Sequence, residues 1–278
     1  MERTSPDVRI VRAIERKSVE LDKRLPPWAR RSHPIIRRQL GMYWKTILPD
    51  VGFLVKIVLV QAGLVVVSLP IPFIFDLALP TITASILLLP VAIYMYVQVL
   101  FAIGYAAAVN VADEVRYDTF TLLRVTPIDL PTILASKIAA AIWRQVENLG
   151  LLIIAAGLFS MPILISQYAT IWPLAQYPVL SRLGMVLGLI VSLLRLILEP
   201  FMIGALGVMA GAGLRVRSSA VIATAIIAFF YFMGMNLIRF LKLPWPLQFG
   251  IEFILPIVLP LLIIWGSLKL AERFITRG

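Results

Sequence analysis

The chain has 278 residues, 60% of them hydrophobic, and a mean hydropathy of +0.92. A soluble domain of this length is closer to half apolar, so the composition predicts a protein surrounded by lipid. The chain has no cysteine and one histidine, His33, in a polar N-terminal segment. Disulfides, thiolate metal sites and a haem held by two imidazoles are therefore excluded, and we expect no metal, no cofactor and no catalytic residue.

The net charge of +11 does not point to nucleic acid, because the basic residues cluster at the ends of apolar runs. That pattern favours anionic lipid headgroups as the partner. The first apolar run begins only after about fifty polar residues, so we predict no signal peptide.

Residues 1–50 are basic and are predicted to form two amphipathic helices on the cytoplasmic side. The second is expected from Ser32 to Pro49, where apolar residues recur at helical spacing opposite basic ones. A basic helix with an aromatic residue just before a span is typical of a helix lying in the membrane interface. The residues expected at that interface are Arg37, Arg38 and Trp44. For the first of the two predicted helices, a solvated charged tail explains the sequence equally well.

Six apolar stretches follow, and each is long enough to cross ~30 Å of hydrocarbon, which takes roughly 20 helical residues. They lie at about 51–69, 82–111, 149–165, 184–212, 220–238 and 251–270. The sequence therefore predicts an all-α polytopic membrane protein with about six transmembrane helices. Its transmembrane domain would cover 51–278 and include a cytoplasmic loop at 112–147.

The distribution of lysine and arginine predicts the orientation. With the N-terminus in the cytoplasm, 21 of the 26 basic residues fall inside and three outside. Cytoplasmic loops carry such an excess, so both termini are expected in the cytoplasm. We expect an integral protein of a bacterial or archaeal plasma membrane.

Two charged residues of the fourth predicted span, Arg195 and Glu199, are four positions apart and can pair on one helix face. Charges in a span are costly, and they mark either a polar substrate path or an internally neutralised contact between helices. Both readings stay open, with the structural one favoured. Two pairs of glycines in the same span, Gly184/Gly188 and Gly207/Gly211, predict close helix packing.

The loop between the second and third spans is the most informative stretch. A charged turn at Asp113–Glu114 leads into a short amphipathic segment that carries Phe120 and Leu123, and Thr126-Pro127 ends it. Asp129 then caps a helix that passes Lys137 into the third span. A short helix with exposed apolar residues at the ends of two spans is suited to docking a soluble partner, although an ordinary solvated connector is the alternative.

This loop resembles that of type-2 ATP-binding-cassette exporter permeases, in which an acidic turn, Gly-Thr-Leu-Glu, a leucine run and Thr-Pro precede a helix containing Gly-Lys. The matching residues here are Glu114, Thr119-Phe120, Leu122-Leu123, Thr126-Pro127 and Ser136-Lys137. The segment 33–38 is likewise similar to the Asn-Pro-Ile-Leu-x-Arg-Glu segment that opens such permeases. The chain departs from the pattern at Asp118, where the family has glycine, and at Thr121, where it has glutamate.

The resemblance implies a permease subunit of an ATP-driven exporter, working by alternating access. The loop would be the coupling helix on which a separate ATP-binding subunit docks, and a second permease subunit, identical or not, would complete the path. The docking residues implied are Glu114, Asp118, Thr119, Phe120, Leu123, Thr126 and Pro127. The chain lacks Gly-x-x-x-x-Gly-Lys-Ser/Thr, so we do not expect it to hydrolyse ATP itself.

The departures at Asp118 and Thr121, together with the long basic N-terminal segment, motivate a different class of function. In that reading the chain is a non-transporting accessory or scaffold subunit of a larger membrane complex. An intramembrane enzyme is disfavoured because the spans lack cysteine and histidine. A proton-coupled carrier using Glu199 is disfavoured because the sequence shows no internal repeat.

Overall fold

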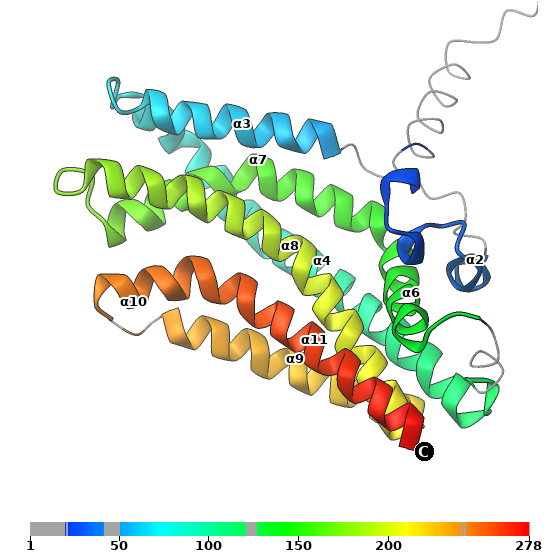
Figure 1. Cartoon of the computed structure of the whole chain (residues 1–278). Coiled ribbons are helices and arrows are strands. Elements are labelled where there is room, and N and C mark those ends of the chain that lie inside the picture. The colour runs from blue at the N-terminus through cyan, green and yellow to red at the C-terminus, as the bar shows by residue number, and fades with distance from the viewer. Residues whose placement is uncertain are drawn as a thin grey trace, which may run out of the picture.

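The computed structural model describes residues 20, 22–41, 51–120, 127–239, 241 and 243–277. These residues form helices joined by short connections, without a strand among them (Figure 1). Five helices in the described part are long and apolar enough to cross a membrane. They are α4 (Ile74–Arg116), α7 (Val146–Ile171), α8 (Pro178–Leu214), α9 (Arg217–Arg239) and α11 (Leu255–Arg277). The protein is an all-α polytopic membrane protein, as its composition predicts.

The first predicted span, 51–69, forms α3 (Val51–Val67), which is shorter than the other five. Its 17 residues extend about 26 Å at 1.5 Å per residue, just below the thickness of the hydrocarbon core. Polar contacts of α3 and of Ser68, the residue that follows it, attach this segment to the bundle. Gln61 donates to the carbonyl of Gly157 in α7 at 2.6 Å, and buried Arg182 of α8 donates to the carbonyl of Ser68 at 2.8 Å.

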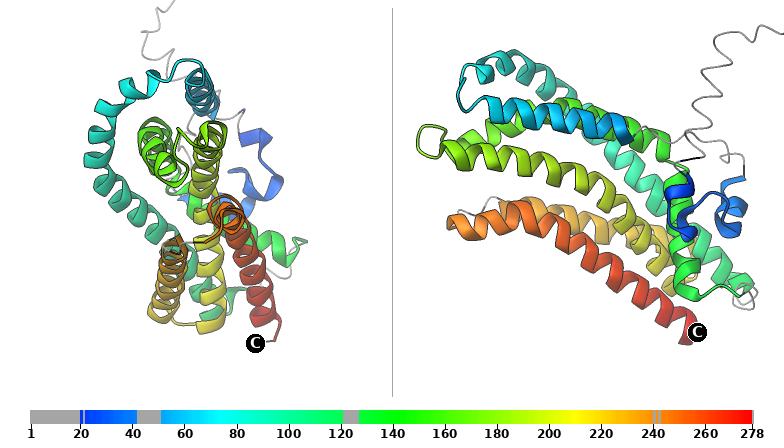
Figure 2. Two further views of the ribbon diagram at one scale, coloured as in Figure 1. Left: turned by 90° about the vertical axis from the view of Figure 1, so that its left-hand side faces the viewer. Right: turned by 45° about the horizontal axis from the view of Figure 1, so that its top comes forward.

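The second predicted span is much longer than expected, because α4 is a continuous helix of 43 residues. Its first half curves away from α7 and α8 in the end-on view, while its second half lies against α8 and α9 (Figure 2). Pro90 lies in the outward part. A proline removes one helical hydrogen bond and bends a helix without ending it, provided neighbouring groups are satisfied.

The remaining spans are found where the sequence predicts them, each extending past the apolar window. The stretches at 149–165, 184–212 and 220–238 correspond to α7, α8 and α9. The sixth stretch begins in a π-helical turn, η3 (Gly250–Ile254), which joins the short α10 (Trp245–Phe249) to α11. Hydropathy marks the lipid-compatible part of a helix, whereas the helix itself continues until a turn residue or a proline stops it.

Helix α8 is the centre of the bundle and contacts α3, α4, α7, α9 and α11. Two of its glycines allow a close approach to α4. A β-carbon on Gly207 would lie 2.7 Å from the carbonyl oxygen of Gly104, and one on Gly211 would lie 2.5 Å from that of Ala108. No side chain fits at those distances, so the predicted small-residue packing is confirmed for this pair.

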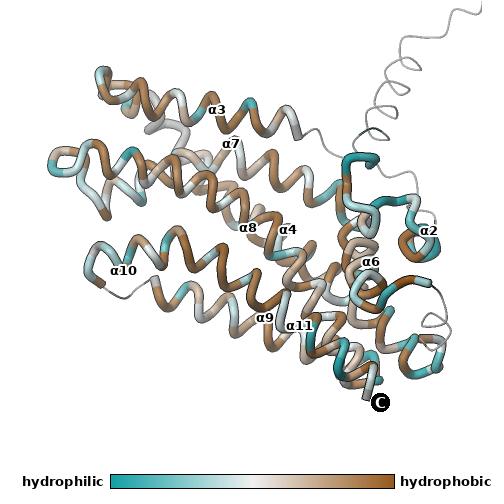
Figure 3. The backbone as a smooth tube through the Cα atoms, in the orientation of Figure 1, coloured by the Kyte–Doolittle hydropathy of each residue, from teal (hydrophilic) through white to brown (hydrophobic). Residues whose placement is uncertain are grey.

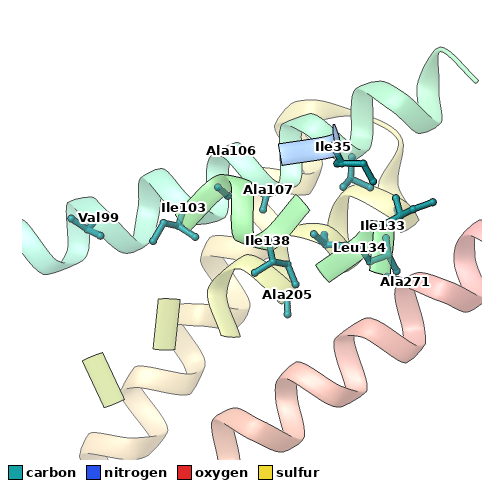
Figure 4. Close-up of a cluster of buried hydrophobic side chains, with 14 of the residues drawn as sticks. Ile35, Val99, Ile103, Ala106, Ala107, Ile133, Leu134, Ile138, Ala205 and Ala271 are labelled. Carbon is teal, nitrogen blue, oxygen red and sulfur yellow. The ribbon is translucent and has the colours of Figure 1, made fainter. Parts of the chain in front are cut away.

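At one end of the bundle a short helix, α6 (Leu130–Trp143), lies with η1 (Pro27–Ala29) and α2 (Pro34–Leu40), and the C-terminus is at the same end (Figure 1). The long helices are hydrophobic along most of their length, whereas hydrophilic residues gather around α2 and near the C-terminus (Figure 3). The core at this end joins several helices, with Ile103 of α4, Ile138 of α6 and Ala205 of α8 in one cluster (Figure 4). We refer to it as the loop end.

The second amphipathic helix begins close to the predicted residue, but its apolar face packs within the protein. Ile36 and Leu40 of α2 are fully buried against α6, in a cluster that includes Trp143. The Trp143 indole nitrogen donates to the carbonyl of Ala29 at 2.8 Å. The apolar face of residues 34–40 is therefore covered by α6 within the protein, whereas the sequence interpretation has it facing lipid. The interfacial position of the segment stays a prediction. Trp44 and the first predicted helix, apart from its last few residues, lie outside the described residues.

Candidate partner-docking site

A buried ion pair between Glu114 and Lys137 links the helix before the predicted docking loop to the helix after it. Glu114 lies in the last turns of α4 and Lys137 in the middle of α6, and the Lys137 side chain is fully buried. The Phe120 ring lies 5.6 Å from the Lys137 ammonium and completes its enclosure. Burial lowers the pKa of Lys137, and the charge of Glu114 opposes that shift. The pair joins the two helices that bracket the loop and so limits how far they can separate.

The backbone of the loop begins with a tight turn at the end of α4. The Tyr117 amide donates to the carbonyl of Asp113 at 2.9 Å, and Asp118 has a φ of +55°. The Thr119 hydroxyl donates back to the carbonyl of Glu114 at 3.3 Å. The left-handed region favours glycine and, among other residues, tolerates aspartate and asparagine best. Aspartate thus adopts here the backbone conformation that glycine adopts most easily.

The sequence analysis predicts that Phe120 lies on an exposed docking face, but in the structure it does not. Its side chain is 3% exposed and packs in the core with residues of α4 and α6. The backbone turns at Tyr117 and Asp118, and the next apolar side chain along the chain, Phe120, is buried. Leu123 and Thr126 lie outside the described residues, while Pro127 is exposed. Phe120 therefore anchors the loop to the bundle.

Two features of this site were missed by sequence reasoning. Lys137 was matched only as a motif residue, although its charge is the partner of Glu114. Tyr117, which is 65% exposed, was not singled out at all. Opposite charges on two consecutive helices, here at the end of α4 and in the middle of α6, are a signal that could have found the pair, since a buried charge requires a partner.

The helix that follows the loop starts as predicted. The Asp129 carboxylate accepts a hydrogen bond from the Thr132 amide at 3.2 Å. Hydrogen bonding from the Thr132 side chain, and then from its amide, holds the pKa of Asp129 below its usual value. Such a cap satisfies one of the free amides at a helix start. However, α6 does not continue into the third span, because the helix is interrupted at Arg144 and Gln145 before α7 begins. The end of α6 is tied to the N-terminal segment, where Arg144 donates to the carbonyl of Gln39 at 2.6 Å.

Substitution of Asp118 is expected to separate backbone conformation from side-chain chemistry. Asp118→Gly should stabilise the folded protein by up to about 1 kcal/mol, because glycine adopts a positive φ without strain. Asp118→Val should destabilise it, since a β-branched side chain is a genuine outlier in this region. Thermal denaturation in detergent measures both. A valine variant as stable as the glycine variant would contradict the positive φ.

The second predicted site, the Arg195–Glu199 pair, lies in the middle of α8. The Arg195 guanidinium contacts the Glu199 carboxylate at 2.7 Å, and the Glu199 side chain is only 2% exposed. Two hydroxyls from other helices also donate to this carboxylate, from Tyr96 of α4 and from Tyr231 of α9 at 3.2 Å. We call these four residues the Glu199 cluster. It connects three helices, whereas the sequence indicated only the pair.

Two apolar grooves flank α4 near this cluster. One, of about 440 Å³, lies between α4 and α7 and has Tyr96 in its wall. The other, of about 320 Å³, lies between α4 and α9. The Glu199 cluster thus fixes α4 to α8 and α9 beside both grooves.

Comparison of the chain with protein families, curated proteins and solved structures gave no match. The likeness to exporter permeases therefore depends only on the motif residues of the loop and of the segment 33–38.

Proposed function

We propose that this chain is the membrane permease subunit of an ATP-driven exporter and that a separate ATP-binding subunit docks on the loop at 112–127. A second permease subunit would complete the transport path. The orientation that we propose places the loop end and both termini in the cytoplasm of a bacterium or archaeon, in line with its excess of basic residues.

One observation carries most of the weight. The acidic residue and the lysine that match the family motif, Glu114 and Lys137, are 23 positions apart and form one buried ion pair. A motif whose charged members come together in space supports a common structural role better than a match in sequence order alone. The positive φ of Asp118 adds support, because the family has glycine there.

The contacts of α6 suggest how a docked subunit would act on the spans. This helix follows the loop directly and contacts α4, α8 and α11 on one side and α2 on the other. Displacement of the loop would therefore shift a helix that is packed between the bundle and the N-terminal segment. ATP binding elsewhere can then change the relative stability of two packings, which is the only way a ligand drives such a switch.

The test is purification from native membranes in mild detergent, with mass spectrometry of the proteins that remain bound in stoichiometric amounts. We expect a subunit with a phosphate-binding loop, and ATP turnover that depends on this chain. A stable complex that contains other membrane proteins and no ATPase would contradict the proposal.

A scaffold or accessory subunit is the second candidate, and the packing of the N-terminal segment favours it. Hydrogen bonds from Trp143 and Arg144 fix residues 27–40 on α6, with Arg37 and Arg38 exposed. A basic surface held this firmly could clamp an acidic neighbour without any transport. In that case deletion of residues 1–40 would cause the complex to dissociate, whereas loop substitutions would leave it intact.

A further inference from the structure

Three consecutive side chains at the end of α4 are exposed, and we call them the Tyr117 turn: Arg116, Tyr117 and Asp118. The phenol ring is 65% exposed, and the Arg116 guanidinium lies 5.8 Å from its centroid. In the described part of the loop, 113–120 and 127–129, no other aromatic side chain is exposed, because Phe120 is buried. The loop therefore presents one large, flat group to its surroundings.

The backbone of the Tyr117 turn is held by contacts before and after it. The Tyr117 amide bonds to Asp113, the buried Phe120 fixes the chain two residues after the turn, and the Glu114–Lys137 pair fixes α4 to α6. A turn whose backbone is already fixed loses less conformational entropy when a partner binds it than a mobile loop does. Tyrosine and arginine, together with tryptophan, are enriched among the few residues that dominate the energy of a protein interface.

The neighbourhood of the ring is charged, which argues against lipid hydrocarbon as its environment. Asp113, four residues before Tyr117 on the same helix face, pairs with Arg217 of α9, whose side chain is 58% exposed. Arg116 and Asp118 flank the ring itself. A site that carries both signs of charge around one aromatic group is complementary to a protein cleft with a polar rim.

From these contacts we infer that Tyr117 is the anchor residue that inserts into a cleft of the soluble ATP-binding subunit, with Arg116 pairing to an acidic residue at the rim of that cleft. This inference rests on the proposed function and names the contact residue of the same site. It replaces Phe120, which the structure turns inward, as the aromatic member of the interface.

The affinity of the purified permease for its ATP-binding subunit tests the inference. Tyr117→Ala should weaken binding at least about ten-fold, whereas Tyr117→Phe, which keeps the ring, should stay within about two-fold of the unsubstituted chain. The matched control is Tyr177→Ala, since Tyr177 is 49% exposed in the connection at the opposite end of the bundle. It should leave the affinity unchanged. Gel filtration of each variant excludes misfolding as the cause.

Photo-crosslinking from position 117 in native membranes separates the remaining outcomes. With p-benzoylphenylalanine in place of Tyr117, an adduct to a subunit with a phosphate-binding loop supports the inference. An adduct to lipid alone overturns it and assigns the ring to the headgroup layer. If the ATP-binding subunit binds Tyr117→Ala as tightly as the unsubstituted chain, the inference fails while the proposed function stands. If no such subunit is bound at all, both fail.

Discussion

Glu114→Ala is expected to cause the largest loss of folded protein among single substitutions at the loop end. It leaves the Lys137 ammonium buried without its carboxylate, and an uncompensated buried charge costs about 3–5 kcal/mol. Lys137→Met should cost less, because the Glu114 side chain left behind is 15% exposed and can reach water. The measurement is thermal denaturation in detergent, followed by size-exclusion chromatography with fluorescence detection.

Removal of both charges is the informative control for this pair. The double variant Glu114→Gln/Lys137→Met should recover most of the stability, because replacing a buried pair by neutral groups of similar volume is often close to neutral. Glu272→Ala serves as the matched control, since Glu272 pairs with Lys269 on an exposed surface at 3.2 Å. Such pairs contribute about 0–1 kcal/mol. Equal stability of Glu114→Ala and Glu272→Ala would contradict the buried pair.

The stability of the Glu114→Ala variant should depend on pH in a defined direction. Burial already lowers the pKa of Lys137, and loss of Glu114 removes the charge that opposes this shift. A lysine whose pKa is lower in the folded than in the unfolded state favours folding more as it loses its proton. The defect of Glu114→Ala should therefore shrink as pH rises from the lowered pKa towards that of a free lysine.

Glu199→Ala is expected to have the largest effect within the membrane. The substitution removes the only acid that contacts Arg195 in the described structure and the acceptor for the hydroxyls of Tyr96 and Tyr231. We expect a loss of about 3–5 kcal/mol, as for other broken buried pairs. Tyr96→Phe and Tyr231→Phe should each cost about 0.6 kcal/mol and at most about 1.7 kcal/mol, the mean and the maximum for hydrogen bonds between membrane helices. Thermal denaturation in detergent gives this ranking.

The neutral double variant Arg195→Gln/Glu199→Gln decides between the two readings of this cluster. If the cluster only holds α4, α8 and α9 together, the double variant should fold, bind the ATP-binding subunit and retain transport-coupled ATP turnover. If the cluster is part of a gate, the variant should fold but lose that coupling. A double variant as unstable as Glu199→Ala would show that loss of the ion pair, and not an unpaired charge, causes the defect.

The fold class could be read from the sequence because it follows from one strong physical constraint. Long apolar stretches need lipid, and a backbone in lipid must satisfy its own hydrogen bonds, so helices were the expected outcome. The ends of the helices were less predictable. The extension of α4 back to Ile74 and the break between α6 and α7 depend on turns and packing that hydropathy does not register.

The candidate sites were predicted in part. Contacts between residues close in sequence were predicted, and contacts between distant residues were not. Arg195 and Glu199 were expected to pair because four residues make one helical turn, and the cap at Asp129 is equally local. The Glu114–Lys137 pair and the tyrosines at Glu199 join residues that are 23 to 103 positions apart. No periodicity links residues so distant, so only the folded arrangement brings them together.

The sequence by itself thus determined the membrane character, the approximate spans, the small-residue contact of α8 and the loop where a partner is proposed to dock. Composition and helical periodicity are local properties, and those features depend on them. The tertiary structure decided which side of each segment is covered. It placed the apolar face of α2 on α6, turned Phe120 inward and left Tyr117 exposed. Burial depends on which distant helix faces a side chain, and that contact exists only after the chain has packed.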